Sequence, residues 1–247
     1  MTHALVTGAG TGIGAAIARR LAAAGFNVSL AGRRRAPLEE VGAGLVLDGF
    51  DVTDPDAIAR GLEKARREFG PIGVLINNAG EALSAPFDKT GPDLWAHILD
   101  VDLTGVYRVT HAALADVKSQ KGRIVNVAST AGLTGYAYVS AYCAAKHGVV
   151  GLTRALALEL AKTGVTVNAV CPGYTDTPLV DKAIETIVAK TGRSPEEARA
   201  SLASGNPQGR LVTPDEVADT VLWLVGPGAS SINGQAIAIA GGEVMAG

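Results

Sequence analysis

Short apolar runs alternate with longer amphipathic segments along the whole chain. The runs are rich in Val, Ile, Leu and Ala and contain few polar residues, so each indicates a strand buried on both faces. Strands are expected at residues 4–7, 28–31, 44–47, 74–77, 124–128, 165–170 and 236–240. Helices are expected at residues 12–24, 55–69, 92–119, 139–163 and 214–225. This alternation predicts an α/β fold, in which helices cover both faces of a parallel sheet.

Composition indicates one globular domain that covers residues 1–247. Apolar residues make up 47% of the 247 and charged residues 19%, and no linker or repeat divides the chain. The net charge of −2 is well mixed, which argues against nucleic-acid and membrane partners. The first residues enter an expected strand directly, so we expect a cytoplasmic protein. Cys143 and Cys171 are then expected to be reduced and packed, with no disulfide, and no metal site is expected.

A glycine-rich turn follows the first expected strand and leads into the first helix. It reads Thr7-Gly-Ala-Gly-Thr-Gly-Ile-Gly14. Glycines there allow a tight turn and let the backbone approach a pyrophosphate, while the helix N-terminus offers free N–H groups to an anion. The spacing of the glycines differs from G-x-G-x-x-G. The turn therefore indicates a dinucleotide site mainly through its position after the first strand. The expected pyrophosphate contacts are Gly8, Thr11, Gly12, Ile13 and Gly14.

The end of the second expected strand carries arginines where a reader of the ribose 2′-hydroxyl would be Asp or Glu. Arg33 and Arg34 occupy this stretch, and no carboxylate there competes with them. Guanidinium groups bind phosphate well, so the pattern favours NADP(H) over NAD(H) as the cofactor. The alternative is that these arginines belong to a solvated loop.

Two further strand ends fall on the same expected edge of the sheet. Asp51 and Val52 follow the third strand, and Asn77-Asn-Ala-Gly80 follows the fourth. Each is ambiguous alone, because Asp51 could cap the helix that begins near residue 55, and the two asparagines could serve a turn.

Ser129, Tyr142 and Lys146 form the strongest candidate for chemistry. Tyr142 and Lys146 are spaced i, i+4, so a helix places them on one face, and Ser129 ends a buried strand thirteen residues earlier. An ammonium about 4 Å from a phenol, at an effective dielectric near 20, contributes roughly 4 kcal/mol. We therefore expect Lys146 to lower the pKa of Tyr142 and prepare it for general acid–base catalysis. Ser129 would hold a substrate oxygen. Alone, a Y-x-x-x-K pair is also common as a tyrosine packed beside an extended lysine.

Residues 176–210 separate the sixth strand from the next helix by more than a tight connection needs. Amphipathic helices are expected at residues 179–190 and 195–203. A long excursion after a strand's carboxyl end indicates a substrate lid, the alternative being a surface insertion.

Taken together, these motifs resemble the short-chain dehydrogenase/reductase family over essentially the whole chain. The resemblance is carried by their order and spacing, from the turn at residues 7–14 to Asn233-Gly-Gln and Gly241-Gly242 near the end. It implies a doubly wound Rossmann-type sheet of seven strands in the order 3-2-1-4-5-6-7.

The resemblance also implies roles for individual residues. Tyr142 would be the acid in reduction and the base in oxidation, Lys146 would bind the nicotinamide ribose, and Ser129 would orient the carbonyl. The remaining cofactor contacts would be Asp51, Val52, Asn78, Ala79, Gly80, Pro172, Gly173 and Thr177. The nicotinamide itself carries out the hydride chemistry.

One position departs from the family pattern. Asp102 stands where members usually have an Asn that supports a water relay beside the lysine, largely through its backbone carbonyl. Asp can keep that role, and its charge would also stabilise Lys146 as a cation while opposing phenolate formation. We expect activity to survive.

The substrate is defined only as a class. A mostly apolar pocket with several phenols suits a ketone or an acyl chain, including a 3-oxoacyl thioester. Its expected residues are Glu81, Leu133, Tyr136, Tyr138, Tyr174 and Leu179. Arg210 could meet an anionic tail, or fix a loop to the helix behind it.

Other functions fit the sequence less well. A dinucleotide-binding sensor or scaffold would need only the cofactor cleft, and a methyltransferase would not need a Tyr/Lys pair. The long helices at residues 92–119 and 139–163 suggest a homo-oligomer, and the family is commonly tetrameric. The alternative is that both helices simply cover the sheet.

Overall fold

The computed structural model describes residues 1–245, and in it a seven-stranded parallel sheet has the order β3-β2-β1-β4-β5-β6-β7. This confirms the expected strand order and the Rossmann-type fold. The strands are β1 His3–Thr7, β2 Asn27–Ala31, β3 Leu45–Leu47, β4 Ile72–Asn77, β5 Arg123–Val127, β6 Thr166–Pro172 and β7 Ala236–Ile239. Their limits differ from the expected ones by one or two residues.

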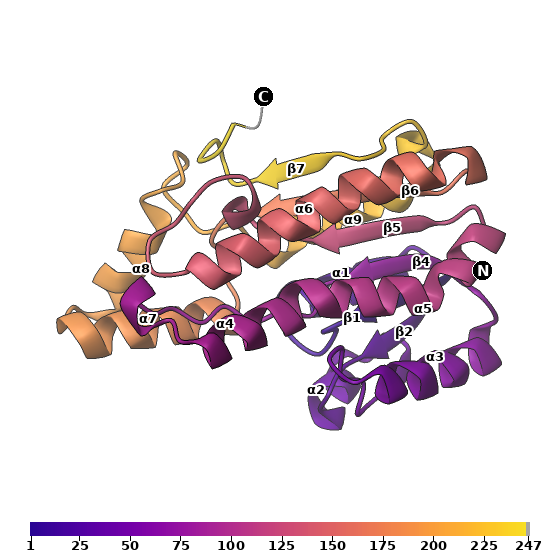
Figure 1. The fold of residues 1–247 in the computed structure, drawn as a ribbon, viewed down its shortest axis with the longest axis horizontal. Helices are drawn as coiled ribbons and strands as arrows, with labels where there is room; N and C mark the ends of the chain where they lie inside the picture. The colour runs from indigo at the N-terminus through magenta and orange to yellow at the C-terminus, as the bar shows by residue number, and fades with distance from the viewer. Residues whose placement is uncertain (246–247) are drawn as a thin grey trace.

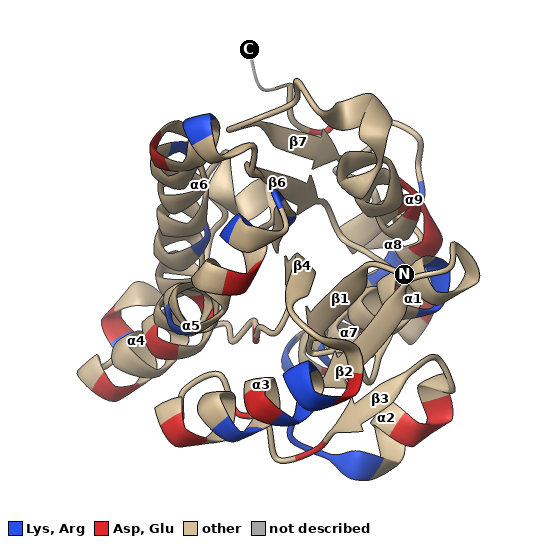
Figure 2. Cartoon of the chain, turned by 90° about the vertical axis from the view of Figure 1, so that its right-hand side faces the viewer, with Lys and Arg blue, Asp and Glu red and all other residues tan. Residues whose placement is uncertain are grey.

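Helices cover the sheet on both faces (Figure 1). They are α1 Gly12–Ala23, α2 Arg35–Val41, α3 Pro55–Phe69, α4 Pro92–Leu99, α5 Gly105–Ser119, α6 Ser140–Leu160, α7 Pro178–Thr191, α8 Pro195–Ala203 and α9 Pro214–Val225. Figure 2 shows α5 and α6 on one side of the sheet and α1 and α9 on the other. One buried cluster joins the sheet to α1 and α9, and a second joins it to α3, α5 and α6. The two clusters confirm the prediction that helices bury both faces of the sheet.

The expected helix at residues 92–119 is not regular. A π-helical turn, Asp100–Thr104, joins α4 to α5. Such a turn contains one residue more than an α-turn, and is often found at functional sites. It holds Asp102, whose side chain is fully buried. Apolar spacing could not reveal this insertion because the helix resumes its pattern on either side.

Helix α2 was not among the expected helices. It is only seven residues long, and Leu38 and Val41 are its buried side chains. Two apolar residues in seven give too weak a pattern to indicate a helix from sequence.

Residues 176–210 form the two expected helices, α7 and α8. A small cluster holds them together, made of Val180, Ile184, Ala198 and Leu211. Arg199 on α8 binds Asp176 at 2.6 Å, across the start of the segment. In Figure 1 both helices lie at the end of the molecule where the strands finish.

Candidate active site

The candidate residues meet at the carboxyl edge of the sheet. In a parallel sheet all strands end on the same side, and a ligand cleft opens where neighbouring strands have connections that run in opposite directions. Here that point lies between β4, the central strand, and its neighbour β1. The glycine-rich turn follows β1, Asn78 follows β4, Ser129 follows β5 and Gly173 follows β6.

The glycine-rich turn has the shape of an anion cradle. Gly8 and Gly12 have positive φ angles of 64° and 53°. At Gly14 an added Cβ would collide with the carbonyl oxygen of Gly8 and the Nδ2 atom of Asn78. Thr11 makes no side-chain bond to the N-terminus of α1, and no acidic residue lies in its first turn. These observations fit the pyrophosphate of a dinucleotide, which free N–H groups at a helix N-terminus would bind.

Asn78 fastens this turn to β4. Its Nδ2 donates to the carbonyl oxygens of Thr7 at 2.9 Å and Gly8 at 3.2 Å. The Thr7 hydroxyl accepts from the backbone nitrogens of Asn78 and Ala79. Asn77 points the other way, into a buried network. The side chain of Asn78 therefore holds the glycine-rich turn in place.

Residues after β6 close the opposite side of the turn. A Cβ at Gly12 would lie 3.0 Å from the Cγ2 atom of Thr177. Pro172 ends β6, and the backbone nitrogen of Gly173 donates to Ile239 at the end of β7. The structure thus brings the glycine-rich turn after β1 close to Thr177, which follows β6.

Arg33 is engaged by a carboxylate, contrary to expectation. Its Nη2 lies 2.9 Å from Glu81, whose other oxygen lies 3.2 Å from His97. Burial opposes the charge of Glu81, yet the hydrogen bonds from His97 and Arg33 hold its pKa below the usual value. Glu81 was expected beside the substrate carbonyl, but its carboxylate faces the arginine. This pairing could not be predicted from sequence, because Glu81 follows β4 and Arg33 follows β2. Arg34 lies beside Arg33 and is exposed.

Asp51 organises its own turn after β3. Its Oδ1 accepts from the backbone nitrogen of Thr53 at 2.9 Å and from the Thr53 hydroxyl at 2.7 Å. Burial acts to raise the pKa of Asp51, but the hydrogen bonds from Thr53 and the charge of Arg33 lower it overall. The alternative that Asp51 caps the next helix is wrong, because Asp54 caps α3. Val52 is buried and packs on the backbone at Gly105.

Ser129, Tyr142 and Lys146 come together as their spacing predicts. The Lys146 Nζ lies 5.4 Å from the centre of the Tyr142 ring. It donates to the Val127 carbonyl at 3.1 Å and forms an ion pair with Asp102 at 3.2 Å. The Ser129 hydroxyl interacts with the phenol and also accepts from the backbone nitrogen of Ala131.

The expected lowering of the Tyr142 pKa is wrong. Burial raises the pKa, and the nearby charge of Asp102 raises it further, so that the Lys146 ammonium and Ser129 only partly offset these effects. Burial also acts to lower the pKa of Lys146, but Asp102 and Tyr142 raise it overall. The lysine is therefore a cation at neutral pH, and the phenol holds its proton.

The side chain of Asp102 contacts both Lys146 and the backbone of Glu81. Burial raises its pKa, and Lys146 and the backbone N–H of Glu81 oppose that rise. A Cβ at Gly80 would lie 2.6 Å from Oδ1 of Asp102, so the close approach of this carboxylate requires a glycine there.

The expected substrate residues divide into two groups. Tyr136 and Tyr174 pack edge to face with ring centres 6.4 Å apart, and Leu133, which shortly precedes Tyr136 in sequence, is half-buried. Tyr138 and Leu179 are exposed, by 67% and 43%. Sequence reasoning missed Glu243, which accepts a hydrogen bond from Tyr136 at 2.7 Å. Its only signal was its position directly after the Gly241-Gly242 pair.

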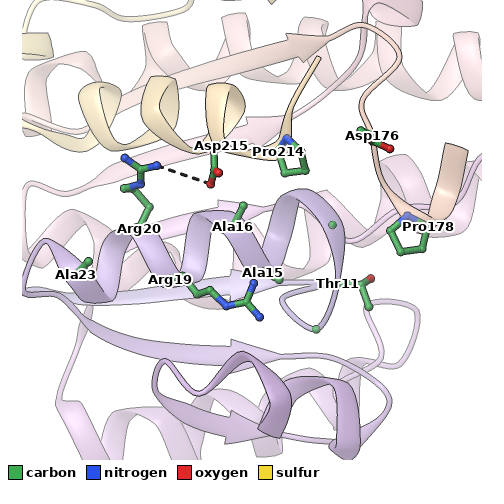
Figure 3. A pocket seen from close by; sticks show the side chains of 12 residues that line it. Thr11, Ala15, Ala16, Arg19, Arg20, Ala23, Asp176, Pro178, Pro214 and Asp215 are labelled. Carbon is green, nitrogen blue, oxygen red and sulfur yellow. Dashed lines mark ion pairs between the residues drawn. The ribbon is translucent and has the colours of Figure 1, made fainter. Parts of the chain in front are cut away.

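A surface groove runs along the outer side of α1 (Figure 3). Its floor is the glycine-rich turn and α1, and its wall includes Asp176, Pro178, Pro214 and Asp215. Arg20 and Asp215 form an ion pair across it at 3.7 Å. None of Ser129, Tyr142 and Lys146 lines this groove.

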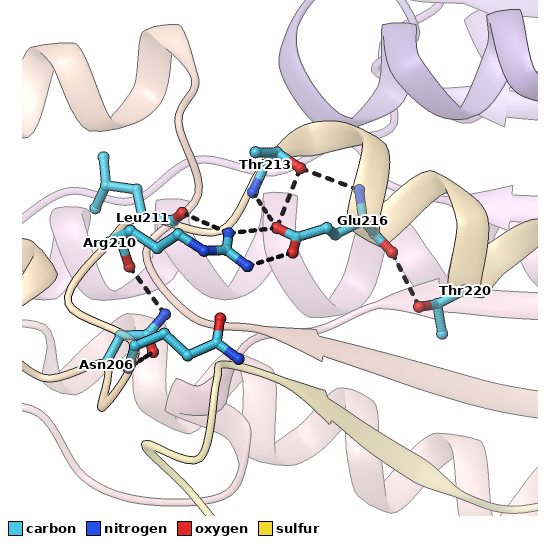
Figure 4. Close-up of polar contacts among 7 residues, drawn as sticks. Asn206, Arg210, Leu211, Thr213, Glu216 and Thr220 are labelled. Atoms are coloured by element: carbon cyan, nitrogen blue, oxygen red, sulfur yellow. Dashed lines mark hydrogen bonds and ion pairs between the residues drawn. The ribbon is translucent and has the colours of Figure 1, made fainter.

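Arg210 fixes a loop, as one of its two interpretations predicted (Figure 4). Its Nη1 and Nη2 donate to the two carboxylate oxygens of Glu216 at 2.8 and 2.6 Å. Glu216 also forms a capping box with Thr213 at the start of α9. The end of the 176–210 segment is therefore tied to α9.

A parallel sheet with an anion cradle at its central strand ends and a serine, tyrosine and lysine beside it defines a dinucleotide-dependent oxidoreductase. Comparison with known proteins gives the family. Residues 2–187 match the short chain dehydrogenase family model. The chain therefore belongs to this family of oxidoreductases.

Relatives align over nearly full length. A putative ketoacyl reductase of Streptomyces coelicolor is 42% identical, over 97% of this chain and 95% of the relative. A D-beta-hydroxybutyrate dehydrogenase of Cupriavidus necator is 40% identical, over 98% and 97%. The crystal structure of an actinorhodin polyketide ketoreductase variant with NADPH superposes with a TM-score of 0.91, at 40% identity and with coverage of 98% and 97%. Within residues 1–245, no helix has the length and apolar character needed to cross a membrane.

Proposed function

We propose that this protein interconverts a ketone and a secondary alcohol with NADP(H), and that a 3-oxoacyl thioester is a candidate substrate. The observation that carries this proposal is the position of Tyr142 and the buried Lys146 beside Ser129, at the strand ends next to the anion cradle. Relatives named as a ketoacyl reductase and a hydroxybutyrate dehydrogenase support the same reaction type.

The chain's own residues account for the proton. Bound NADPH supplies the hydride chemistry. Ser129 donates a hydrogen bond to the carbonyl oxygen and holds it beside the phenol. Tyr142 gives its proton to that oxygen, and its raised pKa keeps it protonated at neutral pH, which suits reduction. The Lys146 ammonium stabilises the phenolate left behind.

Replacing the phenol tests this assignment. Tyr142→Phe removes the proton donor and leaves the ring, so turnover should fall by at least about a hundredfold, the usual minimum for a lost acid–base group. NADPH affinity, measured by fluorescence titration, should change less than about threefold. Tyr107→Phe, at an exposed position on α5, is the matched control. Turnover that persists in Tyr142→Phe contradicts the assignment. A wild-type protein that binds NADPH and reduces no ketone is a sensor or scaffold instead.

NADP(H) rather than NAD(H) is proposed from the arginines at the end of β2. Arg33 and Arg34 offer charge for a 2′-phosphate, and the structural neighbour contains NADPH. A charge-assisted hydrogen bond contributes roughly 1.5–3 kcal/mol, and 1.4 kcal/mol corresponds to tenfold. Arg33→Ser should therefore lower kcat/KM for NADPH by about tenfold or more, and leave NADH within about threefold. Arg67→Ser, an exposed arginine on α3, serves as the control. Equal losses with both cofactors would refute a phosphate contact.

The remaining roles follow from position. We propose that Asp51 and Val52 flank the adenine, that the backbone at Ala79 and Gly80 borders the ribose, and that Thr177 contacts the nicotinamide end. Pro172 and Gly173 would support that end from β6. The helices α7 and α8 would act as a lid, since they follow β6 and pack on each other.

A cytoplasmic homo-oligomer is proposed as the working form. The apolar side chains of Tyr107 on α5 and Leu158 on α6 are exposed by 52% and 83%, which is consistent with an interface between copies. Sedimentation equilibrium should give the mass of a dimer or tetramer, and a monomer mass would contradict this.

A further inference from the structure

The chain after β7 turns back sharply toward the active site. Gly241 and Gly242 have positive φ angles of 59° and 97°, and the backbone nitrogen of Glu243 donates to the Ala240 carbonyl at 3.0 Å. A side chain at Gly241 would collide with the buried Asn206, at the end of the 176–210 segment. The turn is therefore restricted to glycine, and it directs Glu243 toward the loops that surround the substrate.

Three loops converge on the Glu243 carboxylate. Oε1 accepts a hydrogen bond from the Tyr136 hydroxyl at 2.7 Å, in the connection between β5 and α6. A Cβ at Gly173, after β6, would lie 2.9 Å from Oε2. A Cβ at Gly205, after α8, would lie 3.2 Å from Oε1. Among the residues that the structure describes, no Lys, Arg or His forms an ion pair with Glu243.

Two hydroxyl groups connect this carboxylate to the segment that follows β5, which carries Ser129. Tyr136 lies 2.9 Å from the Thr130 hydroxyl as well as 2.7 Å from Glu243. A phenol has one hydrogen, so Tyr136 donates it to the carboxylate and accepts from Thr130, the residue next to Ser129. Burial raises the pKa of Tyr136, and Glu243 raises it further, so Tyr136 stays a neutral donor.

Tyr174 packs beside Tyr136 and is influenced by both Glu243 and Tyr142. Its ring packs against Tyr136, and burial raises its pKa, with further contributions from the charges of Glu243 and Tyr142. Glu243 therefore contributes an unpaired negative charge to the pocket wall that Tyr136 and Tyr174 form.

We infer that Glu243 is a specificity-determining residue that makes the pocket select neutral ketones, including esters and thioesters, over ketones that carry a carboxylate near the carbonyl. The inference rests on the proposed function. A substrate carboxylate would face a like charge in a partly buried site, where water screens it less than at the open surface, whereas an ester meets no such repulsion. β-Hydroxybutyrate is itself a carboxylate, so this chain would differ in substrate class from its relative of that name.

Acetoacetate and methyl acetoacetate provide a matched pair, since they differ mainly by one negative charge. With NADPH, wild-type kcat/KM should favour the ester by at least about tenfold, equivalent to roughly 1.4 kcal/mol. Glu243→Gln should reduce this ratio about tenfold by accelerating acetoacetate, with methyl acetoacetate changed less than about threefold. Glu243→Asp, which keeps the charge, should retain the preference, and Glu63→Gln on the exposed face of α3 should not alter it.

Two results would overturn the inference while leaving the proposed function intact. One is ester turnover with an unchanged ratio in Glu243→Gln, and the other is a wild-type preference for acetoacetate. Turnover of no ketone at all would refute the proposed function, and this inference with it. A second measurement uses only the wild-type protein and so does not depend on whether a variant folds. As inhibitors, methyl 3-hydroxybutyrate should bind more tightly than the 3-hydroxybutyrate anion. Equal inhibition constants would also overturn the inference.

Discussion

Asp102 sets the charge balance around the phenol. Its carboxylate lies 3.2 Å from Lys146 and acts to raise the pKa of Tyr142. Under the proposed mechanism Tyr142 must be deprotonated to act as a base in the oxidation direction, so the rate should rise as the pH passes through its pKa. Asp102→Asn removes the negative charge, and the pKa of Tyr142 should fall. We expect the rising limb of kcat/KM for alcohol oxidation to move to lower pH, with activity retained.

The pH–rate profile of Asp102→Asn, measured from pH 7 to 11 beside the wild type, checks this expectation, because the raised pKa of Tyr142 places the wild-type limb at alkaline pH. An unchanged profile would mean that the Asp102 side chain is a bystander. A shift to higher pH would mean that Lys146 has lost its charge, because without Asp102 burial lowers its pKa. Fluorescence titration of NADPH separates either effect from loss of the cofactor site.

The position of a site residue could be predicted from sequence where the geometry of its own helix or strand determines that position. The helical period places Tyr142 above Lys146, and the common strand edge brings Ser129 to them, so the trio was predictable. The pairing of Arg33 with Glu81, and the return of Glu243 to the pocket, depend on contacts between distant segments. The direction of the Tyr142 pKa shift was wrong because spacing reveals the ammonium but not the burial that outweighs it.

At the scale of elements, the turn between β1 and α1 depends on close backbone contact. In Gly14→Ala the new methyl group would collide with Gly8 and Asn78, which must then move. Overpacking of this kind costs about 1–3 kcal/mol, so the midpoint of denaturant unfolding should fall. NADPH affinity should fall as well, because the same turn forms the anion cradle. Loss of stability without loss of affinity would argue that the cradle lies elsewhere.

Gly151→Ala is the matched control for this substitution. Gly151 lies on the exposed face of α6, and an added Cβ there would meet nothing within 4 Å. Alanine is preferred to glycine in a helix by up to about 1 kcal/mol, so this variant should be more stable than the wild type and bind NADPH equally well.

Elements were predictable where the apolar pattern is long. All seven strands and the long helices were expected because each buries a continuous run or a full stripe of side chains. Helix α2 and the π-helical turn at residues 100–104 were not, because a short helix carries few apolar positions and a single inserted residue leaves the flanking periodicity unchanged.

At the scale of the whole molecule, the tie between the 176–210 segment and α9 affects acid stability. The hydrogen bonds from Arg210 and Thr213 lower the pKa of Glu216 to about 2, from a usual value of 4.5. A carboxyl whose pKa is depressed by folding stabilises the fold above its unfolded pKa, and this contribution is lost as the pH falls through the folded value. The contribution of Glu216 should therefore be complete above about pH 5 and disappear toward pH 2.

Glu216→Gln isolates this contribution, since glutamine can still cap α9 but carries no charge. The variant should melt a few degrees below the wild type at pH 7, a small change because the pair is partly solvent-exposed. The difference in Tm should shrink as the pH is lowered from 5 to 2, because wild-type Glu216 is then protonated. Glu63→Gln should match the wild type at every pH. A Tm difference that stays constant down to pH 2 would show that Glu216 acts through packing or capping, and that its charge contributes nothing to the stability of the fold.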